Sequence, residues 1–251
     1  MKRLFGLIGY PVEQSFSRLY FQKKFATSGI DAEYRLFPMP DLGELRPLIE
    51  AHPELCGLNV TIPHKQQVIP LLDELDPTAQ AIGAVNVIRI IRQADGYLLR
   101  GYNTDSIGFS SSIRPYLKPY MTHALILGTG GASRAVRYGL EQAGISVQFV
   151  SRLPKAGALC YEDLNADIIR RHLLIVNATP LGMFPNTDQC ANLPYDLLTP
   201  QHLLYDVVYN PETTRFMQLG RDHGAQTIGG TGMLTGQAEA AWEIWNGQVS
   251  S

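Results

Sequence analysis

Short apolar runs alternate with amphipathic stretches along the first half of the chain. Runs of four to eight apolar residues bounded by turn formers are typical of strands, and apolar positions spaced three and four apart are typical of helices. Asp95-Gly96 predicts a hairpin turn, so we expect an α/β fold with some antiparallel pairing. The predicted strands are Leu4–Gly9, Glu33–Pro38, Gly57–Ile62, Val85–Ile91 and Tyr97–Tyr102, and the predicted helices are Ser17–Ser28 and His64–Leu75.

A second alternating series begins near Thr122, after a proline-containing linker over Pro115–Met121. Regular alternation of strands and helices indicates a parallel sheet with helices on both faces. The predicted strands are Ala124–Gly128, Val147–Ser151, Leu173–Asn177, Leu203–Val207 and Gln226–Ile228, and the clearest helix is Ser133–Ala143. We therefore predict two α/β domains, residues 1–114 with a mixed sheet and residues 115–233 with a Rossmann-like sheet. The last helix, within residues 234–251, is expected to pack back on the first domain.

Composition narrows the classes of partner. The chain has 251 residues, 45% of them hydrophobic, with 21 Lys and Arg against 23 Asp and Glu. This balance provides no general attraction to nucleic acid or to an anionic membrane. Three cysteines without a CxxC pair indicate neither a disulfide framework nor a zinc cluster, and no apolar run approaches the ~20 residues of a membrane span. We expect a cytoplasmic protein without a metal, as a monomer or a homodimer.

A glycine-rich stretch joins the first strand of the second series to its helix. It reads Gly128-Thr129-Gly130-Gly131-Ala132. Glycines let the backbone approach a pyrophosphate, and a helix N-terminus supplies free N–H groups and the positive end of its dipole. A tight turn with no ligand is the plainer alternative, but the position between strand and helix favours a dinucleotide site.

The end of the next strand distinguishes between cofactors. An NAD site usually has Asp or Glu there for the ribose 2′-hydroxyl, whereas a 2′-phosphate calls for arginine. The strand runs into Ser151-Arg152, and no carboxylate occurs before Glu162. Arg152 can bind phosphate in bidentate fashion, so NADP is favoured, although a solvated surface arginine is the alternative.

Two polar strand ends in the first half are candidates for proton transfer. Lys65 follows Pro63 in what the pattern predicts to be the first turn of a helix, where the dipole would lower its pKa. Asp105 follows the strand ending at Tyr102 and precedes a helical stretch over Ile107–Ile113. A surface lysine and an N-cap are the structural alternatives. Together the two would make an acid/base pair.

Three further polar residues have a similar double interpretation. Ser15 and Ser17 can cap a helix or hold a carboxylate with their hydroxyls. Asn86 interrupts an apolar strand, so its amide is either structural or directed at a ligand.

Taken together, these motifs resemble the shikimate dehydrogenase family over essentially the whole chain. One such motif is weak evidence, but their number and common order are specific. The matching segments are Gly9-Tyr10-Pro11 with Ser15 and Ser17, Asn59–Lys65, Gly83–Asn86, Asn103–Asp105, Gly128–Ala132, Asn177–Met183, Asp206–Pro211 and Gly232–Gln237.

The resemblance implies reversible NADPH-dependent reduction of 3-dehydroshikimate to shikimate, a step in chorismate and aromatic amino-acid biosynthesis. It implies that residues 1–114 form the substrate-binding and catalytic domain, that residues 115–233 bind NADP, and that Lys65 is the acid/base with Asp105 as its partner. The implied substrate-binding residues are Ser15, Ser17, Thr61, Asn86, Asp105, Tyr209 and Gln237. The implied cofactor-binding residues are Gly128, Thr129, Gly130, Gly131, Ala132, Ser151, Arg152, Thr179, Val207 and Gly230.

The chain departs from the family pattern at Gln14, Arg18 and Leu153, where His, Pro and Thr are usual. Two alternatives stay open: a quinate/shikimate dehydrogenase that uses NAD, and a non-catalytic sensor of NADP or a metabolite on the same scaffold. The lack of an acid near Arg152 argues against the first, and the presence of both Lys65 and Asp105 argues against the second.

Overall fold

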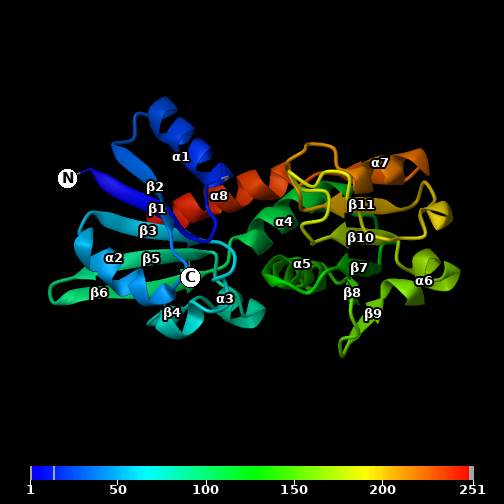
Figure 1. Ribbon diagram of the computed structural model, residues 1–251, viewed down its shortest axis with the longest axis horizontal. Helices are drawn as coiled ribbons and strands as arrows, with labels where there is room; N and C mark the ends of the chain where they lie inside the picture. Colours follow the sequence, from blue (N-terminus) through cyan, green and yellow to red (C-terminus); the bar gives the residue numbers. More distant parts are fainter. Residues whose placement is uncertain (1, 14, 249–251) are drawn as a thin grey trace. The chain divides into compact units, whose positions relative to one another are not determined.

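The computed structural model describes residues 2–13 and 15–248, which form two compact units (Figure 1). The first unit comprises the chain up to Thr104 and the segment from Ala238 onward, and the second is Asp105–Gln237. The division therefore comes earlier than the boundary expected after residue 114, because helix α4 (Asp105–Ile113) belongs to the second unit. Helix α8 (Thr231–Trp245) begins in the second unit and ends in the first.

The first unit contains a mixed sheet in the order β2-β1-β3-β5-β6-β4. Strands β1, β2 and β3 are parallel, and β5 runs antiparallel to both β3 and β6. The predicted strands and the hairpin at Asp95-Gly96 are all present, with boundaries shifted by up to two residues. The elements are β1 (Arg3–Gly9), α1 (Phe16–Thr27), β2 (Ala32–Pro38), α2 (Leu45–Ala51), β3 (Leu55–Val60), β4 (Glu74–Leu75), α3 (Pro77–Ile82), β5 (Val87–Gln93) and β6 (Gly96–Tyr102).

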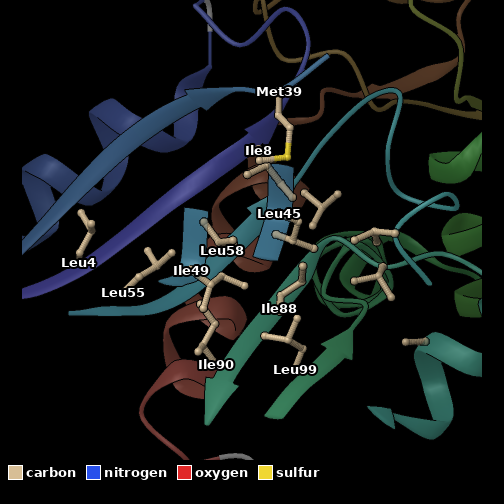
Figure 2. Close-up of a cluster of buried hydrophobic side chains, with 14 residues drawn as sticks. Leu4, Ile8, Met39, Leu45, Ile49, Leu55, Leu58, Ile88, Ile90 and Leu99 are labelled. Carbon is tan, nitrogen blue, oxygen red and sulfur yellow. The ribbon is translucent and has the colours of Figure 1, made fainter. Parts of the chain in front are cut away.

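Both faces of this sheet are buried, because successive side chains of a strand point to opposite sides. On one face, strand residues such as Ile8, Leu58 and Ile88 pack against Leu45 and Ile49 of α2 (Figure 2). The other face is rich in aromatic side chains from β1, β2, α1 and the last turns of α8. These contacts fix the sheet that carries the candidate residues of the first unit, among them Thr61, Lys65 and Asn86.

Trp245 of α8 is the central side chain of the aromatic face. Its indole Nε1 donates to the carbonyl oxygen of Ile88 at 3.1 Å, and its ring stacks on Phe5 with a centroid distance of 4.8 Å. Gly57 leaves the space for it, since a Cβ at this position would lie 2.2 Å from Nε1. The C-terminal helix is thus part of the core of the first unit.

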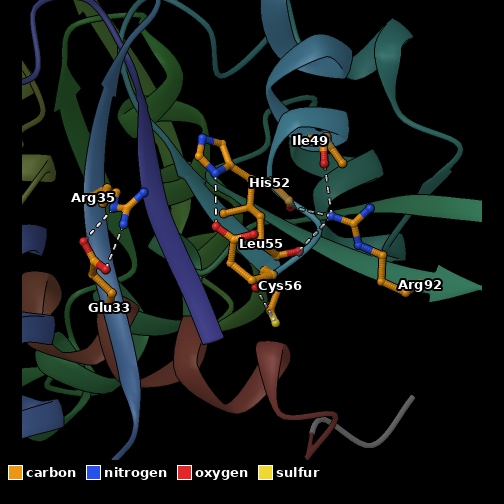
Figure 3. Close-up of polar contacts among 8 residues, drawn as sticks. Glu33, Arg35, Ile49, His52, Leu55, Cys56 and Arg92 are labelled. Atoms are coloured by element: carbon orange, nitrogen blue, oxygen red, sulfur yellow. Dashed lines mark hydrogen bonds and ion pairs between the residues drawn. The ribbon is translucent and has the colours of Figure 1, made fainter. Parts of the chain in front are cut away.

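Arg92, near the end of β5, contacts the end of α2 and the start of β3 (Figure 3). Its guanidinium donates to the carbonyl oxygens of Ile49, His52 and Leu55 at 3.1, 2.8 and 3.4 Å. The carbonyls of Ile49 and His52 belong to the end of α2, where carbonyl groups have no intrahelical donor, so an arginine satisfies them. This end of the sheet is therefore occupied by structural contacts.

The predicted helix over His64–Leu75 is wrong. The segment forms turns, a 3-10 turn over Ile69–Leu71, and strand β4. Pro70 has no N–H to donate and would clash with the preceding helical turn. The N–H of Asp73 instead donates to Leu99 O at 2.9 Å, and the Asp73 carboxylate accepts from Leu99 N at 2.7 Å. The apolar residues that suggested a helix pack individually against the core.

The second unit contains a fully parallel sheet in the order β12-β11-β10-β7-β8-β9. Alternate residues of β7 enter two different cores: Leu125 and Leu127 pack with α6 and α7, while Ala124 and Ile126 pack with α4, α5 and Met233. Helices therefore cover both faces, as the sequence predicted. The elements are β7 (His123–Leu127), α5 (Gly131–Gln142), β8 (Ser146–Ser151), β9 (Ala158–Cys160), α6 (Ala166–Arg171), β10 (Leu174–Asn177), β11 (Leu203–Asp206), α7 (Arg215–Asp222) and β12 (Gln226–Ile228).

Within residues 2–13 and 15–248, no helix is both long enough and apolar enough to cross a membrane.

Candidate functional site

The first group of candidate residues lies along one edge of the mixed sheet. Gly9 and Val60 end the parallel neighbours β1 and β3, and the N–H of Thr61 donates to Ile8 O at 2.9 Å. Because β5 is antiparallel to β3, its start lies at the same edge, where Val60 N donates to Asn86 O at 2.8 Å. Strand register thus brings Thr61, Asn86 and the loop after β1 to a common edge.

Asn86 is buried and tied to the end of β6. Its Nδ2 donates to Thr104 Oγ1 at 2.9 Å, and its Oδ1 accepts from Thr104 N at 2.7 Å. These contacts give the amide a structural role at the edge, which is the first of the two interpretations that the sequence left open. A ligand-binding role for Asn86 stays a prediction.

Ser15 is the N-cap of α1, because its Oγ accepts from Ser17 N at 3.2 Å. Nearby, the hydroxyl of the buried Tyr34 donates to Asn59 Oδ1 at 2.7 Å. Burial raises the pKa of Tyr34, and a hydrogen bond with Ser17 opposes that rise. Tyr34 and Asn59 were missed as members of this polar group, because in the sequence Tyr34 only alternates with Glu33 and Arg35, and Asn59 only interrupts an apolar strand.

Lys65 lies in the turns after β3 and not at a helix N-terminus. The prediction that Lys65 stands in the first turn of a helix is therefore wrong. Its carbonyl oxygen accepts from Val85 N at 2.7 Å, which anchors the backbone beside Asn86. The neighbouring His64 is buried with Nε2 2.5 Å from Met39 O, a structural contact. Lys65 is thus held at the same edge as Thr61, while Asp105, Tyr209 and Gln237 belong to the second unit.

The second group follows the carboxyl ends of the parallel strands. Gly128 follows β7, Arg152 follows β8, Thr179 follows β10, Val207 follows β11 and Gly230 follows β12. The chain passes from β7 to β8 on one side and later to β10 on the other, so strand order reverses between β7 and β10. Nucleotides bind at such reversal points, outside the carboxyl ends of the strands.

The glycine stretch has the form of a phosphate cradle. Gly128 has a φ of +100°, and a Cβ there would lie 2.9 Å from the Thr179 side chain and 3.2 Å from Ala178 O. At Gly130, the N-cap of α5, a Cβ would meet nothing within 4 Å. The backbone at the start of this helix is therefore open to a ligand, and its first N–H groups are suited to an anion.

Arg152 is exposed beyond the end of β8, next to the equivalent end of β9. The turn that carries it is closed by Leu153 N, which donates to Ser151 Oγ at 3.4 Å. Burial raises the pKa of the nearby Tyr161, and the positive charge of Arg152 opposes that rise. Among the departures from the family pattern, Leu153 is 74% exposed and Arg18 is exposed, while Gln14 lies outside the described residues.

The segments after β10, β11 and β12 are joined by hydrogen bonds. Val207 N donates to Asn177 O at 3.0 Å, and Gly230 N donates to Val208 O at 3.1 Å. Only glycine fits at position 230, where a Cβ would lie 2.2 Å from Val207 O. The structure brings Thr179, Val207 and Gly230 to one edge, and it adds the buried Asp206, which was not among the predicted site residues. A carboxylate ending the apolar strand Leu203–Asp206 was the available signal.

Within the described part of the chain, no three His, Cys, Asp or Glu side chains are grouped so that they could hold a metal ion. A parallel sheet with a glycine cradle at its point of reversal, combined with a separate mixed-sheet unit, is typical of a two-domain dinucleotide-binding protein. Residues 7–88 match the family description "Shikimate dehydrogenase substrate binding domain".

Comparison with known proteins identifies the family. The chain is 37% identical to the NADP(+) shikimate dehydrogenase of Desulforamulus reducens, over 96% of this chain and 89% of that protein. It superposes with a TM-score of 0.86 on a shikimate dehydrogenase solved with NADP+, at 33% identity over 98% of this chain and 90% of that one. A Thermus thermophilus enzyme solved with NADP(H) and shikimate has a TM-score of 0.84 and 30% identity, covering 99% and 95%. The chain belongs to the shikimate dehydrogenase family.

Proposed function

We propose that this protein catalyses the reversible NADPH-dependent reduction of 3-dehydroshikimate to shikimate. The observation that carries the proposal is the combination of family membership over nearly the full chain with an open phosphate cradle and Arg152 at the next strand end. The relatives named above act with NADP(+) or were solved with NADP and shikimate. That agreement supports both the substrate and the cofactor.

NADP fits the residues at the carboxyl edge of the parallel sheet. The backbone of Gly128–Ala132 holds the pyrophosphate, and Arg152 with Ser151 binds the 2′-phosphate of the adenosine half. Thr179, Val207 and Gly230 flank the nicotinamide half. When bound, the cofactor supplies or accepts the hydride, and the protein supplies orientation and the proton.

The substrate carboxylate and hydroxyls are assigned to polar residues of both units. Ser15, Ser17, Thr61 and Asn86 come from the first unit, and Tyr209 and Gln237 from the second. Hydroxyls and amides can satisfy a carboxylate by hydrogen bonds without a dedicated arginine. The turns after β3 hold the backbone of Lys65 in place, so its side chain extends from a defined position.

Lys65 is assigned as the acid/base, with Asp105 as its partner. In the direction of reduction, the Lys65 ammonium donates its proton to the oxygen that develops negative charge as the carbonyl carbon receives hydride. In the reverse direction the neutral amine takes the hydroxyl proton. A carboxylate partner stabilises the charged form of the lysine.

The test is an initial-rate panel on the purified protein, with shikimate or quinate as substrate and NADP or NAD as cofactor, read by the absorbance of the reduced nicotinamide. We expect the highest kcat/KM for shikimate with NADP. A preference for NAD would overturn the cofactor assignment in favour of the NAD-using alternative. Shikimate binding without turnover with either cofactor would overturn the enzyme assignment and leave the sensor.

A further inference from the structure

Asp206 is a buried carboxylate to which the proposed reaction gives no role. It ends β11 with no exposed surface. Its Oδ1 accepts from Asn177 Nδ2 and from Val208 N, each at 3.0 Å, and its Oδ2 accepts from Thr214 Oγ1 at 2.6 Å. Burying a carboxylate costs free energy unless hydrogen-bond donors surround it. The three donors offset that cost for Asp206, and they hold its two oxygens in fixed positions.

The hydrogen bonds continue from Asp206 into the segment after β10. Asn177 Oδ1 accepts from both Thr179 N and Thr179 Oγ1, at 3.1 and 2.6 Å. Thr179 Oγ1 in turn accepts from Leu181 N at 3.2 Å. One carboxylate thereby joins the backbone after β10 to the backbone after β11, the two segments that flank the nicotinamide in the proposed function.

We propose that Asp206 is a positioning residue for hydride transfer: through Asn177 and Val208 it holds the two nicotinamide-flanking segments at a fixed separation. The inference rests on the proposed function for the location of the nicotinamide. Asp206 itself is fully buried and so acts through these segments without touching the ring. Hydride transfer is sensitive to misplacement of the reacting atoms, and an error of about 1 Å can cost roughly a hundredfold in rate.

The decisive variant is Asp206→Asn, which keeps the shape and removes the charge. Its Oδ1 is a weaker acceptor for Asn177 and Val208 than a carboxylate oxygen, because the charge assistance is lost. Its Nδ2 faces Thr214 Oγ1, which already accepts from Met217 N at 3.3 Å, so the Thr214 hydroxyl loses the acceptor for its own proton. The matched control is Tyr205→Phe on the same strand. It removes the buried hydroxyl that lies 2.7 Å from Ser112 Oγ, within the core on the other face of the sheet.

For Asp206→Asn we expect kcat with NADP and shikimate to fall about ten- to a hundredfold, with KM for shikimate within about twofold of wild type. Affinity for adenosine 2′,5′-bisphosphate, which lacks the nicotinamide, stays unchanged. Tyr205→Phe lowers Tm and leaves kcat unchanged. A full kcat in Asp206→Asn, or equal kcat losses in the two variants, would overturn the inference.

A second readout requires no turnover. The emission of bound NADPH reports the surroundings of the nicotinamide, and in Asp206→Asn it should shift toward that of free NADPH. If the emission of NADPH bound to Asp206→Asn is identical to wild type, the positioning role is refuted. If the wild type does not oxidise shikimate, only the proposed function is refuted, and the emission comparison still tests positioning. If Asp206→Asn does not fold, Thr214→Val removes one donor to the carboxylate and Thr214→Ser restores it. We expect kcat to fall in Thr214→Val and to return toward the wild-type value in Thr214→Ser. Equal kcat values in the two variants would reject the inference.

Discussion

Asp206 makes the stability of the second unit depend on pH in a direction unusual for a carboxylate. Burial raises the pKa of Asp206 from 3.8 to about 6, although its hydrogen bonds with Thr214, Val208 and Asn177 act in the lowering direction. The unfolded chain releases this proton near pH 4, while the folded protein keeps it up to about pH 6. Between these values the folded state binds more protons, so the free energy of unfolding falls as pH rises.

The magnitude follows from the difference between the two titrations. The two pKa values differ by about two pH units, each worth about 1.4 kcal/mol, so Asp206 contributes about 3 kcal/mol less stability well above pH 6 than well below pH 4. Between pH 4.5 and pH 7.5 the loss is about 2 kcal/mol. Among the described residues, the ionisable side chains on which the charge of Asp206 acts are Tyr195 and Tyr205. Burial raises the pKa of Tyr195 and raises that of Tyr205 to about 12, so both stay neutral in this window. Asparagine at position 206 does not titrate.

The prediction is that Asp206→Asn gains about 2 kcal/mol relative to wild type as pH rises from 4.5 to 7.5. The measurement is urea unfolding followed by circular dichroism at several pH values on both proteins. Other groups titrate equally in the two proteins and cancel in the difference. A difference in unfolding free energy that stays constant across the series would refute the reasoning, and one that moves in favour of wild type would reverse its sign.

Three other substitutions test the assignments at the two sheet edges and in the core. Lys65→Ala should lower kcat by about 10²–10⁴-fold with little change in KM for shikimate, measured by initial rates; lost binding with kcat intact would make Lys65 a substrate clamp. Arg152→Ala should raise KM for NADP about tenfold or more and leave KM for NAD unchanged, and equal values for NADP would show a surface arginine. Gly57→Ala should cost about 1–3 kcal/mol in thermal unfolding, because its Cβ would collide with Trp245. Gly43→Ala, whose nearest contact is 3.4 Å, is the control, and an equal loss there would refute the collision with Trp245 as the cause.

The sequence was sufficient for features that depend on local pattern. Apolar runs located the main strands to within two residues, because a strand buried on both faces requires nearly continuous apolar side chains. The glycine cradle and Arg152 could be recognised because each directly follows a predicted strand along the chain. Family motifs in a common order then implied the chemistry.

Tertiary structure decided whatever depends on residues distant in the sequence. The segment His64–Leu75 has helical spacing of apolar residues, yet its backbone pairs with Leu99 and is interrupted by Pro70, so Lys65 stands in a turn. In the sequence, Asp206 lies near the end of a predicted strand with no sign of its partner, and only the fold places Asn177, 29 residues earlier, against its carboxylate. Local propensity cannot encode such a contact, because its free energy comes from burying charge and donors together, which happens only when the strands are assembled.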